Sequence, residues 1–254
     1  MRARSKAKSR LPAVDPEVNG GPGDDPSVAA KALSRIIERG SRLQAPAVKT
    51  YVDRLRDQHP QATPAQIVKK LERRYLSAVA ASGAAVGSAA AFPGIGTLTA
   101  MASVAGETVV FLEATALYVL AVGEVHGIPT DHLERRRALV LAVLVGEDSK
   151  RAIADLVGSG RTKGAWVADG AATLPLPALS QLNSRLLRYF VKRYTLKRGA
   201  LAFGKTLPVG VGAVVGGVGN RLMGKRIVAN ARAAFGDPPA QWRATLHLLP
   251  PPRG

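Results

Sequence analysis

One uncharged run dominates the sequence, residues 75–106, which read YLSAVAASGAAVGSAAAFPGIGTLTAMASVAG. These 32 residues contain no Asp, Glu, Lys or Arg, and Pro93 and Gly94 divide them into two arms. The first arm, residues 75–92, would be roughly 27 Å long as a helix, close to the ~30 Å of a bilayer's hydrocarbon core. The run therefore predicts a hairpin of two apolar helices that turns at Pro93 and Gly94.

Small side chains fill the first arm of this hairpin. Gly83 and Gly87 are four residues apart and share a helix face. Such a face lets a second helix approach closely. The second arm carries Glu107, Glu113 and Glu124, and an ionised Glu at the centre of a bilayer costs on the order of 3 kcal/mol. We expect the hairpin either to insert into or dock on a membrane, without a full span by the second arm, or to pack as a soluble core.

Charge is distributed unevenly along the chain. The 254 residues hold 36 Lys and Arg against 18 Asp and Glu, a formal net charge of +18. Residues 75–127 hold no basic side chain, whereas residues 161–254 hold 15 basic and two acidic ones. This balance favours a polyanionic partner, and the apolar hairpin favours anionic membrane lipid over nucleic acid. Basic side chains flank the hairpin at Lys69, Lys70, Arg73, Arg74, Arg135, Arg136 and Arg137, which predicts that both of its ends stay on the cytoplasmic side.

The remaining segments predict an all-α protein. Caps, glycines and prolines delimit expected helices, and few segments alternate with the period of a strand. We expect a disordered basic and Gly/Pro-rich tail over residues 1–26, one helical domain over 27–236 and a Pro-rich tail over 237–254. The helices are expected near residues 25–39, 46–59, 64–92, 97–126, 131–145, 147–157, 178–198 and 221–235, the last preceded by a Gly-rich arm led by Pro208.

The expected helix over 178–198 has a basic face. Arg185, Arg188 and Lys192 follow the i, i+3, i+7 spacing, and Arg193 is adjacent. Leu186, Leu187, Phe190, Val191 and Tyr194 supply the opposing apolar surface. This pattern is typical of a helix lying on a membrane surface. It equally fits a core helix whose charged face points into water.

Residues 199–206, GALAFGKT, match the phosphate-binding pattern GxxxxGK[ST] at Gly199, Gly204, Lys205 and Thr206. That motif works between an apolar strand and a helix N-terminus. The residues before Gly199 are basic, and Pro208 occupies the first turn of the helix that should follow. Nucleotide binding is therefore kept only as an alternative function. The chain has no Cys and its four His form no i, i+4 pair, and we predict no catalytic residue, metal or cofactor.

Residues 207–220 (LPVGVGAVVGGVGN) and 224–235 (GKRIVANARAAF), together with the FPGIGTL run at 92–98, resemble the EcsC family over roughly residues 65–236. The resemblance implies a helical fold with a Pro-Gly turn between apolar arms. Its structural signature falls on Pro93, Gly94, Pro208, Gly212, Gly216, Gly217 and Asn220. Gly212 and Gly216 would line a close helix contact. The resemblance also implies a bacterial protein that is encoded near an ABC-type transporter and takes part in secretion or envelope functions, and it supplies no catalytic residues.

These observations predict a non-enzymatic protein that docks on the inner face of the cell membrane. The apolar hairpin and the basic side chains Arg135, Arg136, Arg137, Arg185, Arg188, Lys192 and Arg193 would contact anionic lipid. A membrane transporter or an envelope protein is a further expected partner. If the hairpin is instead a soluble core, the protein would be cytoplasmic. The alternatives are a nucleotide-binding protein that uses residues 199–206, and a soluble nucleic-acid-binding protein.

Overall fold

The computed structural model describes residues 46–89, 97–157, 167, 174–201 and 211–242. In this part of the chain 83% of residues are helical, in seven helices, and there are no strands, which confirms the all-α prediction. The first helix covers residues 46–57. The others are α2 (Pro64–Ala89), α3 (Thr97–Val125), α4 (Leu133–Val145), α5 (Glu147–Val157), α6 (Leu176–Leu201) and α7 (Val211–Phe235). The turn at Pro93 and Gly94 and the residue Pro208 lie outside the described residues.

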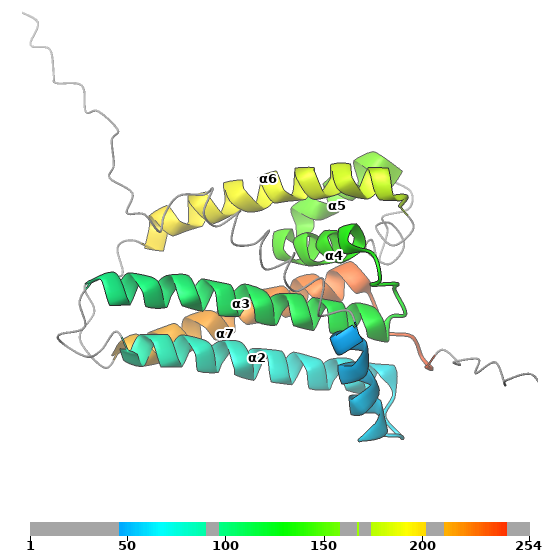
Figure 1. Ribbon diagram of the computed structural model, residues 1–254, viewed down its shortest axis with the longest axis horizontal. Helices are drawn as coiled ribbons and strands as arrows, with labels where there is room; N and C mark the ends of the chain where they lie inside the picture. Colours follow the sequence, from blue (N-terminus) through cyan, green and yellow to red (C-terminus); the bar gives the residue numbers. More distant parts are fainter. Residues whose placement is uncertain (1–45, 90–96, 158–166, 168–173, 202–210, 243–254) are drawn as a thin grey trace, which may run out of the picture.

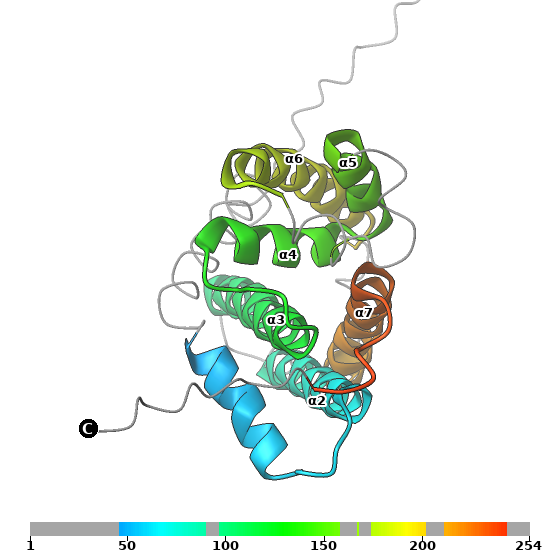
Figure 2. The same ribbon diagram turned by 90° about the vertical axis from the view of Figure 1, so that its right-hand side faces the viewer.

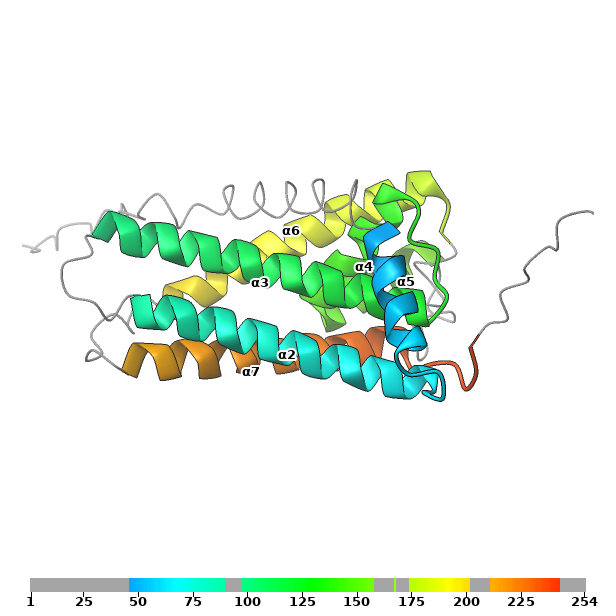
Figure 3. The same cartoon turned by 60° about the horizontal axis from the view of Figure 1, so that its bottom comes forward.

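The long helices α2, α3 and α7 form one group (Figures 1 and 2), in which α2 packs against both α3 and α7. α4 lies on this group, between it and α6, and α5 packs against α4 and α6. The short helices α4, α5 and 46–57 gather where α2 begins and where α3 and α7 end (Figure 3). At the opposite end of the group α2 ends while α3 and α7 begin.

Local sequence signals set several helix boundaries. Thr63 forms a reciprocal cap on α2, because its backbone N–H donates to Gln66 Oε1 at 3.0 Å and its Oγ1 accepts from the Gln66 N–H at 3.3 Å. Gly146 ends α4 with φ 74°, a left-handed conformation that suits glycine. The start of α4 differs from the expected cap at Thr130. The helix begins at Leu133 after His132, which makes no side-chain cap.

The core lies between α4 and the three long helices. The second part of α4 is buried, from Ala138 to Val143 and again at Val145. Leu139 of α4 and Phe235 of α7 are among the largest fully buried side chains of the core. The chain also folds back beyond residue 236, the boundary expected for the domain. Trp242 Nε1 donates to the Ala62 carbonyl at 2.9 Å, and the Arg56 guanidinium lies 4.3 Å from the centre of the Trp242 ring.

α2 and α7 run antiparallel in close contact. Arg232 meets Glu72, Gly224 faces Val79, and further along the pair Gly217 faces Ala80. A Cβ added at Gly224 would lie 2.9 Å from Val79 Cγ2 and 3.1 Å from Leu76 Cδ2, and one added at Gly217 would lie 3.3 Å from the Ala80 carbonyl oxygen.

The same added Cβ at Gly219 would have no neighbour within 4 Å. The closeness of the two helices therefore rests on particular glycines and not on every glycine of α7.

We expect Gly219→Ala to raise the free energy of unfolding by up to about 1 kcal/mol, because Ala is the better helix former and the site is open. Gly224→Ala gains the same propensity but must displace Val79 and Leu76, so it should lie at least about 1 kcal/mol below Gly219→Ala. Urea unfolding followed by circular dichroism measures both. Equal stabilities of the two variants would show that Gly224 does not set the α2–α7 distance.

Candidate functional site

A polar cluster lies between α2, α3 and α7. Arg232 donates to Glu72 through two parallel hydrogen bonds, Nε to Oε1 at 2.7 Å and Nη2 to Oε2 at 2.6 Å. The Glu72 side chain is 8% exposed, whereas that of Arg232 is 64% exposed. Beside this pair the rings of Tyr75 and Tyr118 stack with centroids 4.7 Å apart. Tyr75 Oη also lies 2.9 Å from Thr115 Oγ1, which donates to the Phe111 carbonyl.

The surroundings of Tyr75, Tyr118 and Arg232 raise the pKa of each of these three side chains. Burial raises the pKa of Tyr75 to about 12, against a smaller opposing effect of its hydrogen bond to Thr115. Burial and then the Glu72 carboxylate raise the pKa of Tyr118. The hydrogen bonds to Glu72 raise the pKa of Arg232. The two tyrosines therefore stay neutral and the arginine stays charged near pH 7, which suits a structural role at the centre of the three-helix group.

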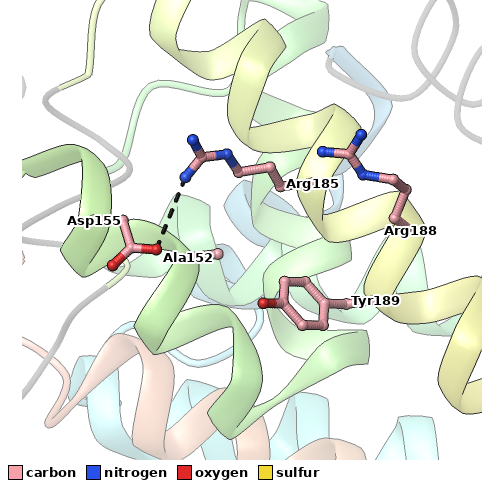
Figure 4. A pocket seen from close by; sticks show the side chains of 5 residues that line it. All are labelled: Ala152, Asp155, Arg185, Arg188 and Tyr189. Atoms are coloured by element: carbon pink, nitrogen blue, oxygen red, sulfur yellow. Dashed lines mark ion pairs between the residues drawn. The ribbon is translucent and has the colours of Figure 1, made fainter.

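A shallow cleft of about 320 Å³ opens between α5 and α6, lined by Ala152, Asp155, Arg185, Arg188 and Tyr189. Figure 4 shows Arg185 directed at Asp155, with Nη1 3.8 Å from Oδ2. Arg188, one helical turn further along α6, is exposed. Two guanidinium groups beside an exposed tyrosine can hold an anion, although Asp155 offsets part of the positive charge.

The apolar face of α6 belongs to the core. Leu182 and Leu186 are fully buried and Phe190 is 8% exposed, and α6 packs against α4. The described part of this face, Leu182 to Phe190, is therefore not available to lipid. On the basic face Arg185 is half-buried and Arg188 is exposed, so contact with lipid by this face stays a prediction. Lys192 and Arg193 lie in the last part of α6, where only the helix path is described.

The three arginines at the start of α4 differ in their surroundings. Arg136 is buried, and its Nη1 donates to the carbonyls of Thr130 at 2.5 Å and Asp131 at 2.9 Å. Burial lowers its pKa, against the opposing charge of Asp131. The expected lipid contact by Arg136 is therefore wrong, because this guanidinium closes the turn before α4. Arg137 lies 3.7 Å from Glu134, and Arg135 is half-buried. All three lie at the end where the short helices gather.

Three charge-free helix segments lie at the other end. No Asp, Glu, Lys or Arg occurs over residues 82–89 of α2, 97–106 of α3 and 211–220 of α7. The antiparallel contacts place these segments beside one another, since Gly217 meets Ala80 and Ala84 and Tyr75 meets Thr115. We call this part of the molecule the charge-free end. Gly83 is buried within it, and Gly87, Gly212 and Gly216 lie in its helices, where only the helix path is described.

An exposed surface of α7 begins at the border of the charge-free end. Val218, Leu222 and Met223 are 52%, 55% and 49% exposed. Arg221, Lys225 and Arg226, which are also exposed, form a basic band on the same stretch of helix. The sequence reasoning missed this surface. The sequence signal for this surface is the set of apolar residues at 218, 222 and 223, which alternate with basic residues. The many glycines just before them made this pattern hard to recognise. Asn220 is half-buried in the same stretch.

The phosphate-binding pattern stands in a helical context. α6 continues to Leu201, so Gly199 lies inside a helix and no strand precedes the motif within the described residues. Gly204, Lys205 and Thr206 lie outside the described residues. A basic helix thus stands where a strand normally precedes such a loop.

Comparisons of this chain with protein-family models, with curated proteins and with solved structures find no match. The resemblance to the EcsC family therefore remains an expectation from the residues quoted above. None of the described helices combines the length and the apolar character that crossing a membrane requires.

Glu124 is half-buried in the second half of α3. Burial raises its pKa from 4.5, with Lys49 and Arg56 opposing and Asp53 adding to the shift. All of these neighbours belong to helix 46–57. The shift therefore reflects the packing of the Glu124 carboxyl against that helix.

We expect Arg232→Ala to lower the free energy of unfolding by about 1–3 kcal/mol, because it leaves the buried Glu72 carboxylate without its partner. Arg226→Ala, an exposed position on the same helix, should change stability by less than about 0.5 kcal/mol. The double variant Glu72→Leu with Arg232→Leu should recover at least half of the loss. If Arg232→Ala unfolds at the same urea concentration as Arg226→Ala, the pair contributes nothing.

Glu124→Gln should stabilise the protein at pH 7. The raised pKa means that folding disfavours the carboxylate, so stability is lost as the pH rises through the folded pKa. Below the ordinary pKa of 4.5 the carboxyl becomes protonated in both states, so the difference between the variant and the wild type should shrink to a small fraction of its value at pH 7. Urea unfolding at pH 7 and at pH 4 tests this, with Glu113→Gln, at an exposed position, as the control. A stabilisation that is the same at both pH values would contradict the assignment.

Proposed function

We propose that this is a non-enzymatic protein that associates with anionic membranes. The observation that carries the proposal is the charge-free end of α2, α3 and α7, bordered on α7 by exposed apolar side chains and a basic band. A surface that carries exposed apolar side chains next to exposed cations binds a membrane interface favourably. The apolar groups leave water, and the cations meet lipid phosphates.

The basic band supports attraction to anionic lipid. Each Lys or Arg near an anionic surface contributes ~1 kcal/mol, so Arg221, Lys225 and Arg226 together supply about 3 kcal/mol. This corresponds to a factor of about 150 in partitioning. The last part of α6, which carries Lys192 and Arg193, runs toward the same end of the molecule (Figures 1 and 3). The basic side chains of α7 and of the last part of α6 attract the protein only to a surface that carries negative charge.

The other basic positions have a smaller part in this proposal. Arg185 and Arg188 line the cleft on α6, and Arg135 and Arg137 lie at the far end of the bundle. The structure does not bring them together with the charge-free end. The resemblance to the EcsC family adds a transporter or an envelope protein of the same membrane as a partner in this function.

We expect the protein to float with vesicles that contain phosphatidylglycerol and not with vesicles of phosphatidylcholine alone. Lys225→Glu with Arg226→Glu should lower the bound fraction at least tenfold, since two attractions become repulsions. The matched control is Arg54→Glu with Lys69→Glu, which makes the same charge change at exposed positions near the start of α2 and should lower binding less than threefold. The measurement is vesicle flotation at ~0.1 M salt, where a Debye length is ~10 Å.

Two results would contradict the proposal. No flotation of the wild-type protein with anionic vesicles would remove the membrane as its partner. An equal loss of binding in the two double variants would show that net charge alone is responsible, without a docking surface on α7.

A further inference from the structure

The exposed side chains of α7 form one continuous face. Val218 and Ala229 are both exposed, and they lie almost in line along the helix because 11 residues make about three turns. The face covers an arc of roughly 140° and runs for about 22 Å along the helix. We call it the outer face of α7, and its members are Val218, Arg221, Leu222, Lys225, Arg226, Ala229, Arg232 and Ala233.

The outer face is turned away from α2. Gly217 and Gly224, which contact α2, lie at least ~100° around the helix from Val218 and Ala229. Figure 2 shows α7 on one flank of the bundle and helix 46–57, drawn in blue, on the other. In the described part of the chain no other helix covers the outer face, so a flat partner can reach its whole length.

An apolar line runs along the middle of the outer face and consists of Val218, Leu222, Ala229 and Ala233. Cations flank this line, with Arg221 and Lys225 on one side and Arg226 on the other. α7 itself contains no Asp or Glu, and the buried Glu72 of α2 pairs with Arg232. This is the pattern of a helix that lies in a membrane interface, where apolar side chains dip below the phosphates and long basic side chains reach back to them.

From this face we infer that the protein lies side-on against an anionic leaflet, with the axis of α7 parallel to the bilayer surface and residues 218–233 in the headgroup region. This inference rests on the proposed function and adds the face and the orientation in which the protein meets the lipid.

The order of the side chains along α7 favours this orientation over an upright one. Arg221 precedes Leu222 from the start of the helix. With α7 upright, Leu222 could reach the acyl chains only by drawing Arg221 below the phosphates, which is costly. With α7 parallel to the surface, apolar and basic side chains are separated around the helix, so both kinds reach a favourable environment.

Charge and exposed apolar surface together identify lipid as the occupant of the outer face. A second copy of this face would place Arg221, Lys225 and Arg226 against like charges. Nucleic acid would supply phosphates but no apolar phase for Val218 and Leu222, which are 52% and 55% exposed. An anionic bilayer supplies partners for both kinds of side chain.

The absence of Cys from the chain makes a direct test possible. Val218→Cys and Ala229→Cys each introduce a single thiol for an environment-sensitive nitrobenzoxadiazole label. The matched control is Thr50→Cys, which is exposed on helix 46–57, on the opposite flank (Figure 2). Vesicles of phosphatidylglycerol and phosphatidylcholine are added, with lipid quenchers placed either near the headgroup or in the middle of the acyl chain.

We expect the labels at positions 218 and 229 to brighten at least about twofold with vesicles, and both to be quenched more strongly from the headgroup level than from the middle of the chain. The label at position 50 should not change. Leu222→Cys provides an independent probe if the label at 218 disturbs folding, which circular dichroism detects.

A variant without a label tests the same orientation. Ala229→Glu places a carboxylate in the apolar line, far from the charge-free end, and should lower the floated fraction at least about threefold. Thr50→Glu makes the same charge change on the opposite flank and should lower it much less. Equal losses in these two variants would contradict the side-on contact.

Other outcomes overturn the inference in different ways. Flotation with brightening at position 218 alone would mean that α7 stands upright, and flotation without brightening at 218 or 229 would remove the outer face as the contact. Both results leave the proposed function standing. Brightening that needs no vesicles and rises with protein concentration would assign the face to a second copy of the chain. Brightening with duplex DNA and not with vesicles would assign it to nucleic acid. Absence of flotation with anionic vesicles would remove the proposed function itself.

Discussion

The close antiparallel contact of α2 with α7 is the constraint on which the rest of the molecule depends. Gly224 provides the space that Val79 and Leu76 occupy, and Gly217 lets α7 approach the backbone of α2 at Ala80. Glu72 and Arg232 fix the register of the two helices at one end of the contact. Because residues of α2 and α7 are matched in this way, the segments without charge on both helices fall at the same end of the bundle.

The same contact divides the molecule into two ends with different chemistry. Near the start of α2, the helices α4, α5 and 46–57 cover the long helices, and the core is closed by side chains such as Leu139 and Phe235. Toward the other end these short helices are missing, and small residues take over from large apolar ones along α2 and α7. Stability is therefore concentrated in one half, while the other half presents a narrow, uncharged group of helices.

Much of the fold could be predicted because helix boundaries are local. Thr63 before Pro64 and Gly146 after Val145 mark helix ends through the backbone they require, and the expected and observed bounds of α2 to α5 differ by only a few residues. The direction of a charged side chain is not local. Arg136 turns inward to the carbonyls of residues 130 and 131, and the apolar face of α6 is covered by α4. Both depend on neighbours far along the sequence, so a basic run could be recognised but its exposed members could not be chosen. The basic band of α7 was missed for the same reason.

The weak hydropathy of the charge-free end follows from its construction. Residues 82–89 and 211–220 are mostly Ala, Gly, Ser and Val, which are small and only moderately apolar on average. In a three-helix end, however, the inward positions meet other helices, where small residues give the closest contact. Only the outward positions meet the surroundings, and the exposed side chains among the described residues there are those of Ala85 and Val218. The affinity of such an end for an apolar phase depends on these few exposed groups and on the cations behind them. Average composition therefore says little about the surface of this end of the bundle, which a few side chains determine.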